Sequence, residues 1–202
     1  NVTAKPLTVS GITTSNKIYD SNSVATLNTS SVAYSGLVIG DTFNGSYTGA
    51  FSDKNIGTGK TVTITPSYTG ADVGNYSITD HSTITANITT KSLIVSGVAA
   101  LDKTYDGSVT ATMDSSSAVY SGFVSGDDFA ASYSGVFDVN ANVGTGKTVN
   151  ITSSYSGADV NNYSVTDQST TTANITAKAL TATASASNKV YNSSSAATVT
   201  LS

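Results

Sequence analysis

Hydrophobic and polar residues alternate along short stretches of this chain, and each stretch ends at a cluster of turn-forming residues. In the stretch 61–65, for example, every second residue is Val or Ile and the others are Thr. This two-residue period is typical of a strand with one buried and one solvated face. No helix cap is followed by apolar residues at helical spacing. The pattern therefore predicts an all-β fold.

The chain also repeats itself, with a step of 86 residues between the clearest copies. The tetrapeptide Lys-Ile-Tyr-Asp at 17–20 returns as Lys-Thr-Tyr-Asp at 103–106 and as Lys-Val-Tyr-Asn at 189–192. Tandem domains produce internal repeats of this kind, so we expect the chain to be a window from a longer array. The expected parts are the end of a preceding repeat at 1–4, a first repeat at 5–90, a second repeat at 91–177 and an incomplete third repeat at 178–202.

One segment of each repeat suggests a particular β-architecture. The heptapeptide Gly-Ala-Asp-Val-Gly-Asn-Tyr at 70–76 returns 87 residues later with Asn in place of its second Gly. It resembles the corner that enters strand F of immunoglobulin-like domains. The resemblance implies that the hydroxyls of Tyr76 and Tyr163 bond to a backbone carbonyl upstream, with Asp72 and Asp159 in the same corners. We therefore expect immunoglobulin-like β-sandwiches. Seven strands are expected in the first repeat, near 6–11, 16–20, 24–34, 42–51, 60–69, 75–80 and 83–90.

The apolar phase reverses where the two repeats meet. Ala86 and Ile88 occupy even positions, whereas Leu93 and Val95 occupy odd positions. Because side chains alternate across a strand, this change turns the apolar face over. No Gly/Ser tract or Pro-rich spacer lies between the repeats. We therefore expect one extended segment to join the repeats end to end without a flexible linker.

The repeated motifs together resemble a known family. They are Lys-x-Tyr-Asp, then Gly-Asp, then Gly-Thr-Gly-Lys-Thr-Val, then Gly-Ala-Asp-x-x-Asn-Tyr, and finally Ala-Asn-Ile-Thr-x-Lys. This combination is similar to the YDG-type repeat of large bacterial surface adhesins, including filamentous-haemagglutinin-like proteins secreted by the two-partner route. The namesake turn contains Tyr19 and Asp20 in one copy and Tyr105 and Asp106 in the next, and Gly follows only at Gly107. The resemblance implies a secreted or cell-surface, non-catalytic stalk.

Composition excludes several classes of function. The chain has 33 Ser and 33 Thr but no Cys, Trp, Arg or Glu, and only one His. Without Cys there is neither a disulfide scaffold nor a thiolate metal site. A net charge of −4 argues against a nucleic-acid partner, which requires a basic face. The apolar runs are too short for membrane insertion. The 11 Tyr and 5 Phe are too many aromatic residues for a disordered chain.

Two segments imitate ligand-binding loops. Residues 59–61, Gly-Lys-Thr, match the end of a phosphate-binding loop, but a strand pattern rather than a helix follows them. Residues 138–144 approximate the oxygen spacing of a calcium loop, but their Gly comes one position late and no Glu exists to complete it. We therefore expect no cofactor, no metal site and no catalytic residue.

Four asparagines recur in register within Asn-x-Ser/Thr sequences and are candidate glycosylation sites: Asn75, Asn87, Asn162 and Asn174. A second chemistry would join Lys17 or Lys103 to Asn87 or Asn174 as an intramolecular isopeptide bond. The alternation points these two Asn side chains outward, which disfavours that bond because it needs an apolar core.

The favoured function is a structural spacer in a secreted adhesin or extracellular fibre, mediating attachment or cohesion of a biofilm matrix. Its expected partners are neighbouring repeats of the same chain. One alternative is a module that binds glycan or another cell-surface receptor. Another is a filament subunit whose incomplete third repeat is completed by a strand from a neighbour.

Overall fold

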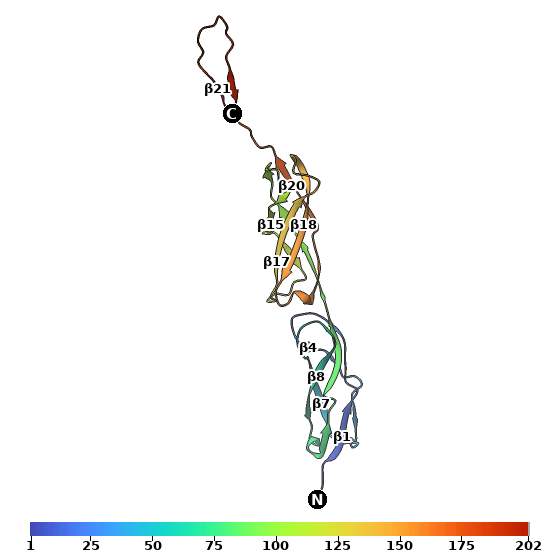
Figure 1. Cartoon of the computed structure of the whole chain (residues 1–202). Helices are drawn as coiled ribbons and strands as arrows, with labels where there is room; N and C mark the ends of the chain where they lie inside the picture. The colour runs from blue at the N-terminus through green and yellow to red at the C-terminus, as the bar shows by residue number, and fades with distance from the viewer. Residues whose placement is uncertain (202) are drawn as a thin grey trace. The chain divides into compact units, whose positions relative to one another are not determined.

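The structure, a computed structural model, describes residues 1–201, so Ser202, the last position of the expected third repeat, lies outside it. The chain is all-β (Figure 1). Its only helices among the described residues are two single-turn 3-10 helices, η1 (Val73–Asn75) and η2 (Val160–Asn162). Neither is long or apolar enough to cross a membrane, and residues 1–201 contain no other helix to consider.

Each repeat contains ten strands, and a short hairpin follows the second repeat. The first repeat comprises β1 (Lys5–Ser10), β2 (Thr13–Thr14), β3 (Lys17–Ile18), β4 (Val24–Ala25), β5 (Leu27–Asn28), β6 (Ala33–Ser35), β7 (Asn44–Phe51), β8 (Gly57–Thr69), β9 (Tyr76–Thr79) and β10 (Thr83–Thr89). The second comprises β11 (Lys91–Ser96), β12 (Ala99–Ala100), β13 (Lys103–Thr104), β14 (Thr110–Ala111), β15 (Met113–Asp114), β16 (Val119–Ser121), β17 (Ala130–Phe137), β18 (Gly144–Ser156), β19 (Tyr163–Thr166) and β20 (Thr170–Thr176). The hairpin pairs β21 (Ala184–Ala186) with β22 (Val199–Leu201).

The sheets of the first repeat are mixed rather than purely antiparallel. One has the order β6-β1-β9, the second has the order β3-β10-β8-β7-β4, and β2 pairs with β5. The β1–β9 and β10–β3 pairs are parallel, whereas the long β7–β8 pair is antiparallel and runs from Asn44↔Thr69 to Phe51↔Val62. The second repeat has the corresponding orders β16-β11-β19 and β13-β20-β18-β17-β14, with β12 paired to β15.

The prediction of a single strand over 24–34 is wrong. This stretch forms three short strands that pair with three different partners: β4 with β7, β5 with β2, and β6 with β1. A chain that changes partner within a few residues cannot keep one ladder of hydrogen bonds, and its strand breaks at each change. The turn within this stretch is closed by the Val32 N–H, which donates to the Thr29 carbonyl at 3.2 Å.

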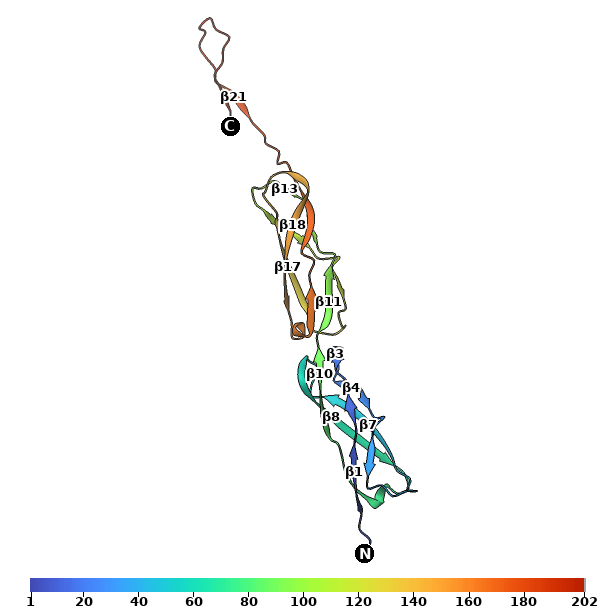
Figure 2. The same cartoon turned by 90° about the vertical axis from the view of Figure 1, so that its right-hand side faces the viewer.

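The reversal of apolar phase lies at Thr90, the single residue between β10 and β11 (Figure 2). Ala86 and Ile88 are buried in the first repeat, where β10 pairs with β8. Leu93 and Val95 are also buried, but β11 pairs with β16 and β19 of the second repeat. Consecutive strands of one segment therefore contribute to the sheets of two repeats.

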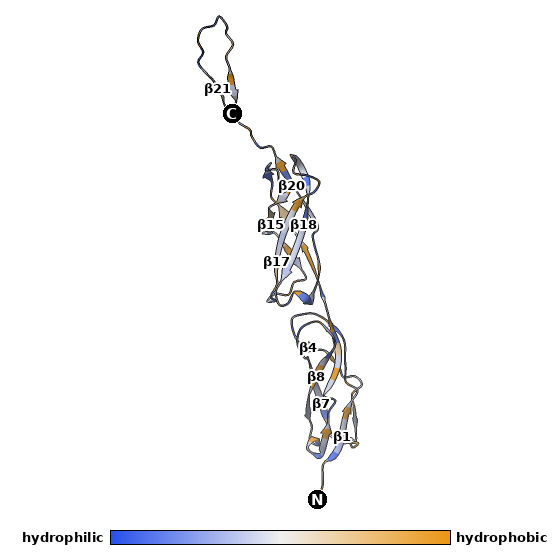
Figure 3. Ribbon diagram, viewed as in Figure 1, coloured by the Kyte–Doolittle hydropathy of each residue, from blue (hydrophilic) through white to orange (hydrophobic). Residues whose placement is uncertain are grey.

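Contacts divide the chain into two compact units. The first comprises Asn1–Val98, Ser115–Tyr133 and Ser153–Gln168, and the second comprises Ala99–Asp114, Ser134–Thr152 and the residues from Ser169 on. Hydrophobic residues are spread along the strands of both repeats rather than gathered in one segment (Figure 3). In the second unit, Phe137, Val149 and Ile175 form the centre of a core with Ala111 and Ala173.

Candidate functional site

The tyrosine corner of the first repeat is built by η1, which places Tyr76 at the start of β9. The Val38 N–H donates to the Tyr76 hydroxyl at 3.0 Å, and this hydroxyl donates to the Asp41 carboxylate. The hydroxyl thus bonds to upstream backbone, but the partner is an N–H group and not the expected carbonyl. Asp72 closes the corner, because its Oδ2 accepts the Thr42 N–H at 2.8 Å.

The second repeat has the same corner at η2. The Tyr163 hydroxyl accepts the Val124 N–H at 3.0 Å and donates to Asp127 Oδ2 at 2.5 Å. Asp159 Oδ2 accepts the Asp128 N–H at 3.0 Å. Each corner thus contains the same five groups: one tyrosine hydroxyl, two carboxylates and two backbone N–H groups.

A glycine is required just before each corner. Gly157 has φ +120°, and a Cβ placed on it would lie 2.3 Å from the Asp128 carbonyl oxygen. Gly70 has φ +135°, and its Cβ would lie 2.1 Å from the Thr42 carbonyl oxygen. Only glycine combines this backbone conformation with so close an approach. This explains why Gly precedes Ala-Asp in both copies.

The second corner is covered by the end of the first repeat, and all the groups involved lie within the first compact unit. Lys54 Nζ lies 2.8 Å from Asp159 Oδ1 and 3.5 Å from Asp127 Oδ1. The Ser21 hydroxyl donates to Asp127 Oδ1 at 2.5 Å. We call the whole set the junction cluster: Tyr19, Ser21, Lys54, Asn55 and Ile56 from the first repeat, and Asp127, Asp159, Asn162 and Tyr163 from the second.

Asn162 connects the two repeats through both ends of its amide. Its Nδ2 donates to Asn55 Oδ1 at 3.0 Å, and its Oδ1 accepts the Ile56 N–H at 3.0 Å. Asn162 is 2% exposed, so its polar atoms are satisfied by protein groups rather than by water. The corresponding Asn75 is exposed.

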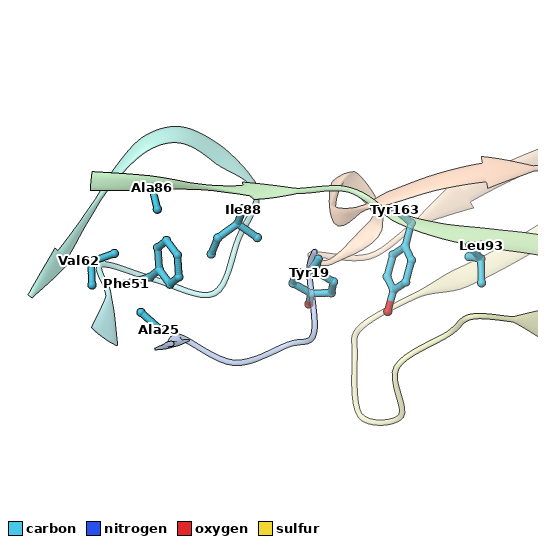
Figure 4. Packing of buried hydrophobic residues seen from close by; sticks show 8 residues of the cluster. All are labelled: Tyr19, Ala25, Phe51, Val62, Ala86, Ile88, Leu93 and Tyr163. Carbon is cyan, nitrogen blue, oxygen red and sulfur yellow. The ribbon is translucent and has the colours of Figure 1, made fainter. Parts of the chain in front are cut away.

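An aromatic contact accompanies these polar bonds. The rings of Tyr19 and Tyr163 meet edge to face, with centroids 5.6 Å apart and an interplanar angle of 76°. They lie between Ile88 and Leu93 in one hydrophobic cluster (Figure 4). Edge-to-face pairs of this kind add about 0.5–1.5 kcal/mol to the gain from burial alone. Tyr19 is 0% exposed.

The electrostatics of the junction cluster favour the ionised carboxylates. Hydrogen bonding to Lys54, and then to the Asp128 N–H, lowers the pKa of Asp159. Burial opposes ionisation of Asp127, but its hydrogen bonds with Ser21 and Tyr163 outweigh burial and lower its pKa. The pKa of Lys54 is raised well above its ordinary value, chiefly because its ammonium bonds to Asp159. Burial, followed by the bond to Asp127, raises the pKa of Tyr163 to about 12.

The Tyr-Asp turns that gave the sequence motif are held by a lysine. Lys17 Nζ lies 2.7 Å from Asp20 Oδ1 and donates to two backbone carbonyls of the turn at 2.9 and 3.1 Å. Lys103 lies 2.7 Å from Asp106 Oδ1 and donates to two carbonyls at 2.8 and 3.1 Å. The fixed spacing in Lys-x-Tyr-Asp thus has a physical reason, which the sequence analysis did not identify.

The residue after each Tyr-Asp pair takes a left-handed backbone conformation. Gly107 has φ +79°, and Ser21 has φ +64°. A non-glycine residue in this region is strained by roughly 1–2 kcal/mol. Ser21 occupies it while its hydroxyl binds Asp127 of the second repeat. Tyr105, two residues before Gly107, is 40% exposed, unlike the buried Tyr19.

The candidate modification sites differ in their surroundings. Asn87 Oδ1 accepts the Gly59 N–H at 2.7 Å, and Asn174 Oδ1 accepts the Gly146 N–H at 2.8 Å. These bonds attach the two side chains to the Gly-Thr-Gly-Lys turns. The ammonium groups of Lys17 and Lys103 instead bind the carbonyls of the Tyr-Asp turns. Burial makes Asn162 inaccessible to a glycan in the folded chain, whereas Asn75 is exposed.

The loop that imitates a calcium site is occupied by a lysine. Lys147 Nζ donates to Asn140 Oδ1 at 2.9 Å, to the Asn140 carbonyl at 3.0 Å and to the Asn142 carbonyl at 2.8 Å. Within residues 1–201, no three His, Cys, Asp or Glu side chains come together as a metal site would require.

Five members of the junction cluster were missed by sequence reasoning: Ser21, Lys54, Asn55, Ile56 and Asp127. A signal existed for Asp127, because the Gly-Asp pair at 40–41 returns at 126–127, but the pair was interpreted as a turn and not as a contact between repeats. Lys54 gave no repeat signal, because Ala141 occupies the matching position.

Comparison with known proteins gives one result. The YDG domain family matches residues 3–86 and again residues 89–173, which together make up well over half of the chain. No curated protein and no solved structure matches the chain.

Proposed function

The chain belongs to the YDG domain family, and from that premise we propose that it is a structural spacer, a stalk segment of a secreted bacterial adhesin or extracellular fibre. In this role it would mediate attachment or cohesion of a biofilm matrix by holding other parts of a long protein at a distance. It performs no catalysis, and its partners are the neighbouring repeats of its own chain.

The observation that supports this proposal best is the burial of polar groups at the junction. Asp127 presents a side chain with 0% exposure, and it is bonded by Ser21 and Lys54 of the preceding repeat. Buried charges are costly unless they are paired and hydrogen-bonded. Two repeats joined as independent beads would gain nothing from such an arrangement. A stalk requires it, because fixed bonds between repeats limit bending.

The finer architecture is part of the proposal. We infer that each repeat, 5–90 and 91–177, is an immunoglobulin-like β-sandwich variant with parallel edge pairs, joined to the next without a flexible linker. The tyrosine corners support the first point. The single residue between β10 and β11 supports the second.

A second candidate is a glycan-binding module. Tyr120, Phe123, Phe129 and Ala131 line a pocket of about 210 Å³, and Phe123 is 37% exposed. Exposed aromatic rings offer a stacking surface to a ligand. The matching positions of the first repeat hold Leu37 instead of Phe123 and Gly45 instead of Ala131.

Binding assays separate the two functions. The chain would be tested on a glycan array and on host-cell surfaces, with Phe123→Ser as the matched variant. The spacer proposal predicts no saturable binding by either protein. Binding that the Phe123→Ser variant loses would replace the spacer with the glycan-binding module.

A further inference from the structure

The corner of the first repeat is open, although the same corner of the second repeat is covered. Val38 is 42% exposed, and Asn75 is exposed, while its counterpart Asn162 is 2% exposed. A pocket of about 400 Å³ lies here. It is lined by residues 2–5 of the chain and by Val38, Asp41, Gly74, Asn75 and Tyr76. The open corner therefore has the same kinds of group, two carboxylates, an amide and a tyrosine hydroxyl, that bind the end of the first repeat at the covered corner.

The charges of this open corner are unbalanced. Asp41 binds the Tyr76 hydroxyl, and Asp72 binds the Thr42 N–H, but within residues 1–201 neither carboxylate forms an ion pair. In the covered corner the two matching carboxylates share the ammonium of Lys54. Lys5 also lines the pocket, but its counterpart Lys91 occupies the same register beside the covered corner. The open corner thus presents the same two carboxylates without an ammonium that corresponds to that of Lys54.

We propose that this open corner is a docking surface for the end of another YDG repeat of the type that the first repeat itself presents. That end carries a Tyr-Asp-Ser turn and a Lys-Asn-Ile loop, at 19–21 and 54–56 here. Its lysine would lie between Asp41 and Asp72, and its Asn-Ile segment would bind the amide of Asn75. This docking specifies how the proposed spacer would be assembled. It rests on the proposed function in one respect, namely that YDG repeats follow one another in a chain.

The two repeat ends in this chain are not equivalent as partners. The second repeat has Gly107 where the first has Ser21, and Ala141 where the first has Lys54. It therefore lacks the hydroxyl that binds Asp127 and the ammonium that binds both carboxylates. Lys54 and Ser21 are thus the residues that determine which ends dock firmly on an acidic corner.

Two extended chains test this directly. In one, a copy of residues 5–90 precedes Lys5, and in the other a copy of residues 91–177 precedes Lys5. Hydrogen exchange of the backbone amides in 72–76 is followed by mass spectrometry, with Ser77→Thr in the original repeat to distinguish its peptide from the copy. Docking of the matched end should slow exchange at least about tenfold, as expected for a few charge-assisted hydrogen bonds. The end of the second repeat should slow it much less.

Equal slowing by both ends, or slowing by neither, would overturn the proposal. Because an added repeat can fail to fold, Lys54→Ala is also tested in the unextended chain. There the exchange of 159–163 should approach the faster exchange of 72–76, and no change would likewise overturn the proposal. These outcomes differ from failure of the spacer function, which appears as a loose junction between the two repeats already present.

Discussion

Lys54 of the first repeat and Asp159 of the second form an ion pair, with Nζ 2.8 Å from Oδ1. Asp159 is 6% exposed, and the same ammonium lies 3.5 Å from Asp127. One cation thus neutralises part of a buried acidic corner that belongs to a different repeat. An exposed ion pair contributes little to stability, but removing one partner of a buried pair leaves a charge without compensation.

Replacing this cation should weaken the junction. In Lys54→Ala, Asp127 and Asp159 stay buried without an ammonium, so we expect a lower melting temperature by calorimetry. Lys178→Ala is the matched control, because Lys178 is exposed and forms no ion pair within residues 1–201, so its loss should have little effect. An unchanged melting temperature in Lys54→Ala would show that the ion pair does not stabilise the fold.

Stability should also fall in acid. The pKa values of Asp127 and Asp159 are lowered in the folded chain, so the unfolded chain binds more protons as the pH drops. The stabilisation is present above the ordinary Asp pKa of about 3.9 and is lost as the pH falls through the lower folded values. Urea unfolding at a series of pH values would measure this. Asp159→Asn should show a shallower loss below pH about 4, and a slope equal to that of the unmodified chain would contradict the assignment.

The two tyrosine corners should respond unequally to the loss of a hydroxyl. Tyr163→Phe removes a donor to the buried Asp127 and an acceptor for the Val124 N–H, which should cost about 1–3 kcal/mol. Tyr76→Phe should cost less, because its corner is open and water can replace the lost bonds. Chemical denaturation of both variants is the measurement. Equal losses of unfolding free energy in the two variants would contradict the account, because they would mean that covering the second corner does not strengthen its hydrogen bonds.

A backbone test is independent of charge. Gly157→Ala places a Cβ against the Asp128 carbonyl in a left-handed conformation, which should cost roughly 1–3 kcal/mol. Gly146→Ala is a useful comparison, because its φ is also positive, at +59°, but nothing lies within 4 Å of its Cβ. It should destabilise less, and the reverse order would show that the close approach is unimportant.

The local pattern predicted much of the fold. The reversal from Ile88 to Leu93 is visible in the alternation of apolar residues, because burial on a strand follows a two-residue period. The division of 24–34 into three strands was not predictable, because it depends on which distant strands pair with each piece. The alternation of apolar and polar residues shows which face of a strand is buried, but it does not show which neighbouring strand the backbone pairs with.

The junction cluster was harder to predict for a related reason. Tyr19 was identified because it recurs, whereas Lys54 has no counterpart in the second repeat. Comparison of the repeats identifies the residues that recur because each domain needs them to fold. It misses a residue that only one repeat carries and that contacts the neighbouring repeat. Ser21 was missed in the same way, because comparison of the repeats shows that it occupies the position of Gly107 but not that it bonds to Asp127.

The most direct test of the account is the distribution of distances between the two repeats. The chain has no Cys, so Thr48→Cys and Ser154→Cys, both at exposed positions, accept spin labels without side reactions. Electron-electron double resonance should give a narrow distribution for the labelled chain. It should give a broad one when Gly-Ser-Gly-Ser is inserted between Thr90 and Lys91, because such a spacer behaves as random coil. A distance distribution for the labelled chain that is already as broad as that of the insertion variant would contradict the spacer function.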